Sequence, residues 1–294
     1  MTTARVEKAP AKVNLTLRIG NRRPDGYHEL ESLVVFAHVG DALSFTPDRV
    51  LALSVRGPTA AAAGEIADNL VLKAAHALAD RIAGLKLGRF VLSKRLPVAA
   101  GLGGGSSDAA AALRFLACAN RIARNDPRLM QAARAVGADV PVCLDPRPRL
   151  MHGIGDILSE PMRLPRLPAV LANPGVAVAT KEVFDLLHRT GRSGSTARPL
   201  SLVGARGGDA AFLDELAMDR NDLEVPAIAL QPAIAGVLAA LRGSLGCRLA
   251  RMSGSGATCF GLFSSARAAA AAARRLRSQH SSWWIRATML GGSA

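Results

Sequence analysis

A run of glycines and serines at residues 101–107 carries the clearest chemical signal in the sequence. It reads Gly-Leu-Gly-Gly-Gly-Ser-Ser. Glycines leave backbone N–H groups open to a ligand, and the alanine-rich segment from about Ser107 predicts a helix whose N-terminal dipole favours an anion. The run lacks the Gly-Lys-Ser/Thr of a Walker A loop and does not fit the dinucleotide fingerprint. It therefore indicates a phosphate-binding loop of another kind, with a flexible connector as the alternative.

Three other places carry polar groups whose roles the spacing alone leaves open. Residues 252–257 form a second glycine-serine loop between two strand-like segments. Lys12 lies on the polar face of a predicted strand, and Asp139 lies just past a predicted helix. Taken one at a time, a turn, a solvated lysine and a helix-end carboxylate are the better interpretations.

The first forty residues predict a hairpin. Apolar and polar residues alternate over 11–19, which is typical of a half-buried strand and puts Lys12 and Asn14 on its polar face. Residues 23–26 (Arg-Pro-Asp-Gly) suit a turn, and the β-branched and aromatic residues of 30–39 predict the returning strand.

Two helices are predicted between this hairpin and the middle of the chain. Asp68 can cap a helix over residues 69–82, which has one apolar stripe. The dipeptide Asp126-Pro127 is a cap followed by proline at the first helical position, and Gly137 can end that helix in a left-handed conformation. Asp139 then belongs to a connection, because the residue after it precedes a proline.

The second half of the chain alternates strand-like and helix-like segments, including a predicted helix over 228–242, which is an α/β pattern. Prolines punctuate residues 146–168, so we expect two domains, residues 1–160 and 161–294. The tract 191–208, rich in Gly, Ser and Arg, is the best candidate for a mobile loop.

Composition excludes several classes of protein. The 294 residues are 49% hydrophobic and 20% charged, as in globular proteins with a large core. The four cysteines form no Cys-x-x-Cys pair, which argues against a disulfide framework and a zinc ribbon. Neither an apolar signal segment nor a membrane-length apolar run is visible, so we expect a cytoplasmic protein without a membrane partner.

The net charge of +14 would suit a nucleic-acid partner. Only six of the 37 Lys and Arg residues are lysines, and the arginines are scattered without a run of five. With the alanine tracts, this indicates compositional bias, and we expect no nucleic-acid partner.

Five segments are more informative together, in their order along the chain, than each is alone. They are residues 10–15 (Pro-Ala-Lys-Val-Asn-Leu), 24–28 (Pro-Asp-Gly-Tyr-His), 101–109 (Gly-Leu-Gly-Gly-Gly-Ser-Ser-Asp-Ala), 137–141 (Gly-Ala-Asp-Val-Pro) and 252–257 (Met-Ser-Gly-Ser-Gly-Ala). Together they resemble the motifs of the GHMP kinase superfamily, small-molecule kinases that use ATP. The similarity runs from about residue 9 to 263, and residues 220–224 (Arg-Asn-Asp-Leu-Glu) also look like the family's. Five motifs in the right order are highly specific.

The resemblance implies a two-domain α/β (α+β) fold. Its N-terminal ribosomal-S5-like domain would bind ATP, its C-terminal α/β domain would be smaller, and the active site would lie in the cleft between them. Tyr27-His28 and the segment at 137–141 separate the chain from mevalonate and homoserine kinases. They point to the member that phosphorylates the 2-hydroxyl of a cytidine-diphosphate-linked methylerythritol in the nonmevalonate (MEP) route to isoprenoid precursors. Such an enzyme would be a cytoplasmic monomer or homodimer.

Two other functions are alternatives. One is a kinase of the same superfamily that acts on a simpler alcohol, against which Tyr27-His28 speaks. The other is a basic nucleic-acid-binding protein, which would need stacking platforms, whereas the chain has one tyrosine and dispersed arginines.

The resemblance also implies roles for single residues. Asp139 corresponds to the base at the reacting hydroxyl and Lys12 to its charged partner. A hydroxyl needs a proton acceptor as its bond to phosphorus forms, and a lysine lowers the cost of the developing charge. The positions expected to contact ATP are Lys94, Pro97, Val98, Ala99, Ala100, Gly101, Leu102, Gly103, Gly104, Gly105, Ser106 and Ser107.

For the substrate, the resemblance implies that Tyr27 and Phe184 sandwich the cytosine, although Phe184 on a helix from Thr180 could equally be core. The positions expected to contact substrate are Asn14, Tyr27, His28, Asp139, Phe184, Gly254 and Ser255. Magnesium is expected with ATP, and its protein ligand is unknown, with Ser106 and Ser107 both candidates. Residues 98–100 (Val-Ala-Ala) replace a methionine and glycine frequent in the family, so we expect a stiffer loop entrance.

Overall fold

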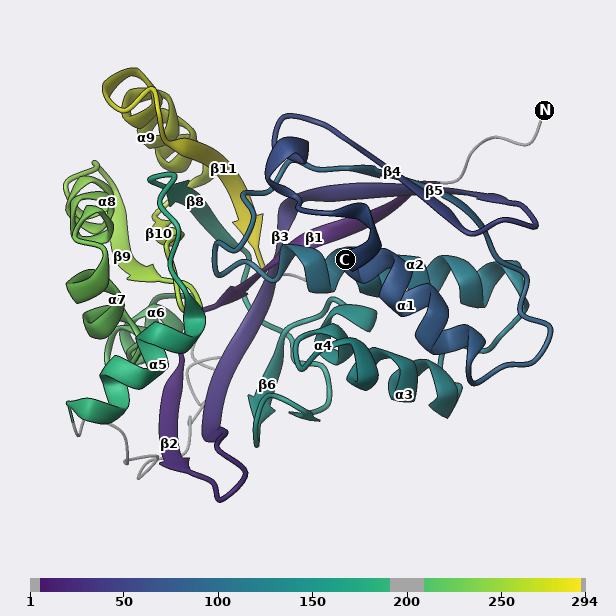
Figure 1. Cartoon of the computed structure of the whole chain (residues 1–294). Coiled ribbons are helices and arrows are strands. Elements are labelled where there is room, and N and C mark those ends of the chain that lie inside the picture. Colours follow the sequence, from purple (N-terminus) through teal and green to yellow (C-terminus); the bar gives the residue numbers. More distant parts are fainter. Residues whose placement is uncertain (1–5, 191–208, 292–294) are drawn as a thin grey trace. The chain divides into compact units, whose positions relative to one another are not determined.

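The structure, a computed structural model, describes residues 6–190 and 209–291 (Figure 1). The predicted mobile loop at 191–208 lies outside these residues. Helices and strands alternate along the chain, which confirms the predicted α/β class. The chain forms two compact units that interleave along the sequence: unit 1 is Met1–Lys12, Gly40–Val98 and Gly103–Pro146, and unit 2 is Val13–Val39, Ala99–Leu102 and Arg147–Ala294. The division near residue 160 stays a prediction about the domains.

Unit 1 combines a small sheet with helices. Strand β4 pairs with β5 in parallel, and the second half of β3 pairs with β5 in antiparallel register from Ala42↔Ser93 to Pro47↔Gly88. Helix α1 packs on α2 and α3, and α2 packs on α4. The elements of the unit are most of β1 (Val6–Asn14), the end of β3 (His28–Pro47), β4 (Ala52–Arg56), the 3-10 turns η1 (Ala60–Ala62) and η2 (Ile66–Asp68), α1 (Leu70–Ala79), β5 (Gly88–Ser93), α2 (Gly104–Ala119), α3 (Pro127–Val136) and α4 (Val140–Leu144).

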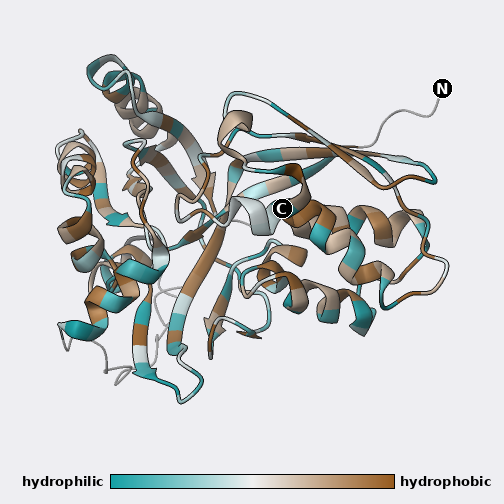
Figure 2. Cartoon of the chain, viewed as in Figure 1, coloured by the Kyte–Doolittle hydropathy of each residue, from teal (hydrophilic) through white to brown (hydrophobic). Residues whose placement is uncertain are grey.

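Unit 2 is built on an antiparallel sheet in the order β3–β11–β8–β10–β9. Strands β2 and β6 also pair with β3, and β7 pairs with β6. Figure 2 shows β3 changing from hydrophilic residues beside the β2–β3 turn to hydrophobic residues further along. The remaining elements are β2 (Arg18–Arg22), β6 (Arg149–His152), β7 (Ile157–Leu158), β8 (Leu167–Asn173), α5 (Thr180–Arg189), α6 (Asp209–Ala217), α7 (Glu224–Leu230), α8 (Ala233–Arg242), β9 (Cys247–Met252), β10 (Cys259–Phe263), α9 (Ala266–Gln279) and β11 (Trp284–Leu290).

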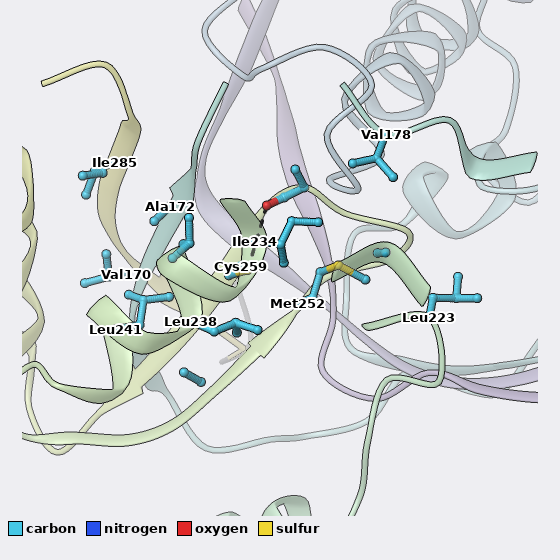
Figure 3. Packing of buried hydrophobic residues seen from close by; sticks show 14 of the residues in the cluster. Val170, Ala172, Val178, Leu223, Ile234, Leu238, Leu241, Met252, Cys259 and Ile285 are labelled. Atoms are coloured by element: carbon cyan, nitrogen blue, oxygen red, sulfur yellow. Dashed lines mark hydrogen bonds between the residues drawn. The ribbon is translucent and has the colours of Figure 1, made fainter. Parts of the chain in front are cut away.

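One hydrophobic cluster forms the core of unit 2. Helices α8 and α9 both pack on its sheet. Figure 3 shows Ile234, Leu238 and Leu241 of α8 among side chains of the strands, such as Val170 and Ile285. All five side chains are at most 1% exposed. Aliphatic burial on this scale supplies most of the favourable free energy of folding, which fits a chain poor in aromatic residues.

The predicted strand over residues 11–19 is interrupted. Strand β1 ends at Asn14 and β2 begins at Arg18. Between them Thr16 is fully buried, with its Oγ1 accepting from the Leu33 N–H, and the Leu17 N–H donates to the Arg220 carbonyl. These tertiary hydrogen bonds replace the regular ladder, which an alternation of residue types does not reveal.

The predicted helices are present, but some of their caps and ends differ from the prediction. Asn69, not Asp68, caps α1, because its side chain accepts from the Val71 N–H. Asp126 caps α3 as predicted, but Gly137 is extended (φ 170°) rather than left-handed. The helix predicted over 228–242 is two helices, since Pro232 begins a new turn.

Among the described residues, no helix combines the length and the apolar character needed to cross a bilayer.

Candidate active site

Lys12 and Asp139 form an ion pair in unit 1. Lys12 Nζ donates to Asp139 Oδ1 at 2.8 Å, although 127 residues separate them. The lysine side chain is 6% exposed and the aspartate side chain 40% exposed. A buried ammonium therefore meets a carboxylate that is still open to a ligand. The roles of base and charged partner stay predictions.

Short local structures hold both members of this pair. Lys12 is near the end of β1, where its neighbours Ala11 and Val13 are fully buried. Asp139 is the N-cap residue of the short helix α4, and its side chain makes no capping hydrogen bond. The predicted connection at Asp139 is thus a tight turn between α3 and α4. Because the carboxylate does not cap the helix, it is free to face Lys12.

The glycine-rich segment passes directly beside Lys12. Gly103 has φ +58°, and a Cβ on it would lie 3.1 Å from both Cβ and Cε of Lys12. It is the N-cap of α2, which begins at Gly104, three residues earlier than predicted, and it offers no side-chain cap. The first N–H groups of a helix have no partner within the helix. The opening of α2 is therefore suited to bind an anion close to the Lys12–Asp139 pair.

Of the two serines in this segment, Ser107 is turned inward. It is 1% exposed, and its Oγ donates to the Pro10 carbonyl at 2.7 Å and lies 3.4 Å from the Cys143 thiol. Burial raises the pKa of Cys143 to about 12, so this thiol stays neutral and inert. Ser107 thus connects α2 to β1, and Ser106, which is partly exposed, is the serine with an available hydroxyl.

Lys94, predicted to contact ATP, is buried in unit 1. Its Nζ donates to Asp41 Oδ2 at 2.5 Å and to Asp108 Oδ2 at 2.9 Å, and all three side chains are at most 5% exposed. Nearby, Pro97 is partly exposed and Val98 is exposed. The role of Lys94 in ATP binding stays a prediction, and its contacts are with two carboxylates.

Residues 99–102, which include the first two residues of the glycine-rich segment (101–107), belong to unit 2 and contact the second glycine-serine loop. The Gly101 carbonyl accepts from Ser253 Oγ at 2.9 Å, and the Ala100 carbonyl accepts from the Thr258 N–H. Ala99 has φ +50°, a conformation that costs an alanine about 1–2 kcal/mol. Residues 252–257, which by themselves suggested an ordinary turn, therefore support the start of the glycine-rich segment through hydrogen bonds.

Replacement of Gly101 by alanine is expected to destabilise this contact. Gly101 has φ +74°, and an added Cβ would lie 2.2 Å from the Ser253 carbonyl oxygen. Gly84→Ala is a matched control, because Gly84 has φ +70° but no heavy atom within 4 Å of that position. We expect Gly101→Ala to cost about 2 kcal/mol more than the control, a further Tm decrease of about 4–8 °C. Equal shifts in thermal unfolding would contradict the contact.

Asn14 lies at the centre of a hydrogen-bond network in unit 2. Its Nδ2 donates to Ser32 Oγ at 2.7 Å and its N–H donates to Ser253 Oγ at 3.1 Å. Asn14 is 4% exposed, and its Oδ1 is a buried acceptor without a partner among the described residues. A buried amide oxygen of this kind is available to a ligand hydroxyl or amine, which fits the predicted contact with substrate.

A second asparagine, Asn221, fixes the loop at 252–257. Its Nδ2 donates to the carbonyls of Met252 and Gly254, both at 2.8 Å. Ser255, predicted to contact substrate, has its Oγ 2.8 Å from Thr180 Oγ1 at the start of α5. Asn221 was recognised in the sequence as part of a family segment, but its supporting role was not predicted.

His28 and Phe184 lie together in unit 2. Their ring centroids are 5.3 Å apart, and His188, one turn further along α5, is 6.3 Å from His28. Tyr27 is 59% exposed, and no ring pair among the described residues includes it. His28 Nε2 is buried without a hydrogen-bond partner in the same described part of the chain.

The electrostatics favour a neutral His28. Burial, then Arg22 and His188, lower the pKa of its imidazole below the usual value. Near neutral pH the ring then offers one donor and one acceptor to a ligand. His188 was missed in the sequence, although its spacing of four residues from Phe184 on a helix is a signal that could have identified it.

Within residues 6–190 and 209–291, no group of three or more His, Cys, Asp and Glu side chains is arranged to hold a metal ion. A metal cage made entirely of such side chains is therefore not a feature of the described chain.

Comparisons with known proteins agree with this geometry. A family profile described as "GHMP kinases N terminal domain" matches residues 69–145, and one described as "GHMP kinases C terminal" matches residues 201–282. A 4-diphosphocytidyl-2-C-methyl-D-erythritol kinase of Xanthobacter autotrophicus is 57% identical, over 96% of this chain and 98% of the relative. The enzyme of the same name from Methylorubrum extorquens is 54% identical, also over 96% and 98%.

A solved structure shows the same likeness. The crystal structure of a 4-(cytidine 5'-diphospho)-2C-methyl-D-erythritol kinase superposes with a TM-score of 0.79 at 37% identity, covering 98% of this chain and 100% of that one. The family predicted from the ordered motifs is thereby confirmed. With matching profiles in both halves and relatives more than 50% identical over nearly all of its length, the chain belongs to the GHMP kinase family.

Proposed function

We propose that this chain transfers the γ-phosphoryl group of ATP to the 2-hydroxyl of 4-diphosphocytidyl-2-C-methyl-D-erythritol, a step of the nonmevalonate route to isoprenoid precursors. The observation that carries the proposal is the Lys12–Asp139 ion pair at 2.8 Å, beside the backbone of the glycine-rich segment. The names of the relatives, at 52–57% identity, support the substrate. GHMP kinases use ATP as the phosphate donor, and this chain is a kinase of that kind.

Asp139 is the proposed proton acceptor. One of its oxygens is held by Lys12, and the half-open side chain leaves the other to accept a hydrogen bond from the substrate hydroxyl. As the hydroxyl oxygen bonds to the γ-phosphorus, the bond from phosphorus to the β,γ-bridging oxygen breaks and ADP leaves. The hydroxyl proton goes to the Asp139 carboxylate.

Lys12 provides positive charge for this step. Its ammonium is buried, so its interaction with negative charge on the transferred group is less screened than at the surface. Phosphoryl transfer is largely a matter of positioning and charge stabilisation. The ion pair contributes to both, because Lys12 holds the carboxylate of Asp139 in position and also supplies the positive charge.

The residues of the glycine-rich segment fit a nucleotide. Gly103 leaves space next to Lys12 that a Cβ would crowd at 3.1 Å, and the start of α2 has no side-chain cap. ATP bound there would supply the transferable phosphoryl group, and Mg²⁺ would neutralise the charge of its phosphates. Ser107 Oγ donates to the Pro10 carbonyl, so the Ser106 hydroxyl would be the available protein ligand for Mg²⁺.

Tyr27 is the proposed anchor for the cytosine. An exposed ring on the β2–β3 turn is free to stack on a base, and its neighbour His28 has an unpartnered buried nitrogen for a hydrogen bond. Stacking contributes about 1–3 kcal/mol, so we expect Tyr27→Ala to raise the KM for the cytidyl substrate about 5- to 150-fold. The KM for ATP should not change. If Tyr27→Leu behaves like Tyr27→Ala, the effect is stacking; an unchanged KM in both would exclude it.

A substrate panel tests the function. ADP release would be coupled to NADH oxidation with the cytidyl alcohol, mevalonate, homoserine and no acceptor. We expect turnover with the cytidyl alcohol and at least about 100-fold lower kcat/KM with the others, as lost anchoring and positioning require. Equal or greater turnover of mevalonate or homoserine would contradict the proposed substrate. A monomeric or homodimeric state and a cytoplasmic location stay predictions.

A further inference from the structure

Unit 1 buries a cluster of three charged side chains that the proposed chemistry does not use. Asp41 lies on β3, Lys94 just follows β5, and Asp108 lies in the second turn of α2. The three residues are 2%, 4% and 2% exposed, and the lysine donates to both carboxylates. We refer to Asp41, Lys94 and Asp108 as the buried triad.

The buried triad holds the backbone on both sides of the glycine-rich segment. Asp41 Oδ1 accepts from the N–H groups of Arg95 and Leu96, at 2.5 and 2.9 Å, and Leu96 precedes the segment by five residues. Asp108 lies on α2, directly after the last residue of the segment. Since Lys94 donates to both carboxylates, it links the backbone before the segment to helix α2 at the end of the segment.

The segment lies next to the triad at Gly104. A Cβ on this residue would lie 3.5 Å from Lys94 Nζ and 3.7 Å from Asp41 Oδ2, which is van der Waals distance. Gly104 is the first residue of α2, where helix N–H groups are open to an anion. The triad therefore lies beside the groups suited to bind phosphate.

The charges of the triad do not balance. Two buried carboxylates share one ammonium, and Asp108 Oδ1 has no hydrogen-bond partner among the described residues. Breaking up such a cluster is costly, but replacing it with apolar residues is often neutral or stabilising. Stability alone is therefore a weak reason for a kinase to keep these three charges.

We propose that the buried triad is a positioning network that sets the affinity for ATP. It does so by fixing the backbone before the glycine-rich segment relative to helix α2 at the end of the segment. This rests on the proposed role of the segment in binding the phosphates of ATP. Lys94 then acts through the backbone of the segment and not by contact with the nucleotide.

The protonation of Asp108 supplies a readout specific to this role. Burial raises the pKa of Asp108 to about 7, with Asp41 adding to the shift and Lys94 opposing it. For Lys94, burial disfavours the charge, but Asp108 and Asp41 outweigh it and raise its pKa, so the lysine stays charged. These are the charged groups that face Asp108. Above about pH 7 Asp108 is ionised and bonds Lys94 as a carboxylate; below it, the carboxyl is neutral and holds Lys94 less tightly.

Asp108→Asn tests the proposal with little change in shape, because the amide oxygen still accepts from Lys94. At pH 8 we expect the KM for ATP to rise about tenfold and the KM for the alcohol to stay within about twofold, as loss of positioning at one substrate predicts. At pH 6 wild-type Asp108 is itself mostly neutral, so the variant-to-wild-type ratio should fall towards one. Titration of ATP cancels in this ratio. A ratio of one at pH 8, or one that does not change with pH, would overturn the proposal.

A double-mutant cycle separates positioning from direct contact. Asp41→Asn and Lys94→Met should each raise the dissociation constant of a non-hydrolysable ATP analogue, measured by calorimetry without the alcohol, and the double variant should be no worse than Lys94→Met. If Lys94 touched the nucleotide, Asp41→Asn would leave binding nearly unchanged, and the proposal would be wrong. Asp48→Asn, in the exposed pair with Arg89, is the matched control and should bind like wild type.

The experiments distinguish failure of the triad proposal from failure of the proposed substrate. If the three variants lower only the unfolding temperature while analogue binding is unchanged, the triad is structural and the proposal fails. If the wild-type protein binds the analogue but does not phosphorylate the cytidyl alcohol, the proposed substrate fails while the binding experiment still judges the triad. A wild-type protein that binds no nucleotide would contradict both.

Discussion

Asp139→Asn is expected to lower kcat at least about 100-fold while the dissociation constants for ATP and the cytidyl substrate change less than about threefold, as for loss of a general base. The amide keeps the volume of the carboxylate and can still accept from Lys12 Nζ, now at 2.8 Å from Asp139 Oδ1. It cannot take up the proton of the hydroxyl. Steady-state kinetics together with calorimetric binding separate the two effects.

The control for this variant is Asp68→Asn. Asp68 also pairs with a lysine, Lys73, at 3.1 Å, but its side chain is 81% exposed, so we expect unchanged kinetics. If Asp139→Asn retained near-normal turnover, Asp139 would not be the base. If instead both kcat and binding collapsed, the carboxylate would be needed for ground-state binding rather than for proton transfer.

Lys12→Met is expected to lower kcat about 100- to 1000-fold, the effect of removing one preorganised donor that stabilises the charge of the transition state. Methionine fills the space of the lysine stem, which lies next to Gly103, so the glycine-rich segment should keep its conformation. The loss should therefore be in charge stabilisation, and the Tm should change little. Kinetics with ATP and the cytidyl alcohol, together with thermal unfolding, test this.

Two comparisons make the Lys12 experiment specific. Lys73→Met removes a lysine from an exposed pair and should have no effect on turnover. Lys12→Arg keeps the charge but not the compact ammonium, and the close approach of Gly103 leaves little room for a guanidinium, so it should not restore full activity. Full activity in Lys12→Met would show that the transferred group does not need this charge.

The sequence predicted the components of the site better than their assembly. The glycine-rich segment was identified from residue types alone, because glycine, helix start and anion binding are linked by local physics. Nothing local links Lys12 to Asp139, which are 127 residues apart. Only the resemblance to the family predicted that Lys12 and Asp139 are partners. In the structure their side chains are hydrogen-bonded.

Other features depend on contacts that sequence patterns do not contain. The break between β1 and β2 follows from hydrogen bonds of Thr16 and Leu17 to distant residues. Asp41 is a single aspartate on a strand without any motif, so its contact with Lys94 was not predictable. The interleaving of the two units arises from the same kind of long-range packing, whereas a proline-rich stretch is visible in the sequence itself.

The central claim is that Asp139 and Lys12 meet the reacting hydroxyl. A crystal structure with a non-hydrolysable ATP analogue, Mg²⁺ and the cytidyl alcohol measures this directly. We predict the 2-hydroxyl oxygen within hydrogen-bond reach of an Asp139 carboxylate oxygen, about 2.6–3.2 Å, with Lys12 Nζ still bound to the same carboxylate. A complex with the hydroxyl beside the γ-phosphate but more than about 6 Å from both side chains would contradict the account.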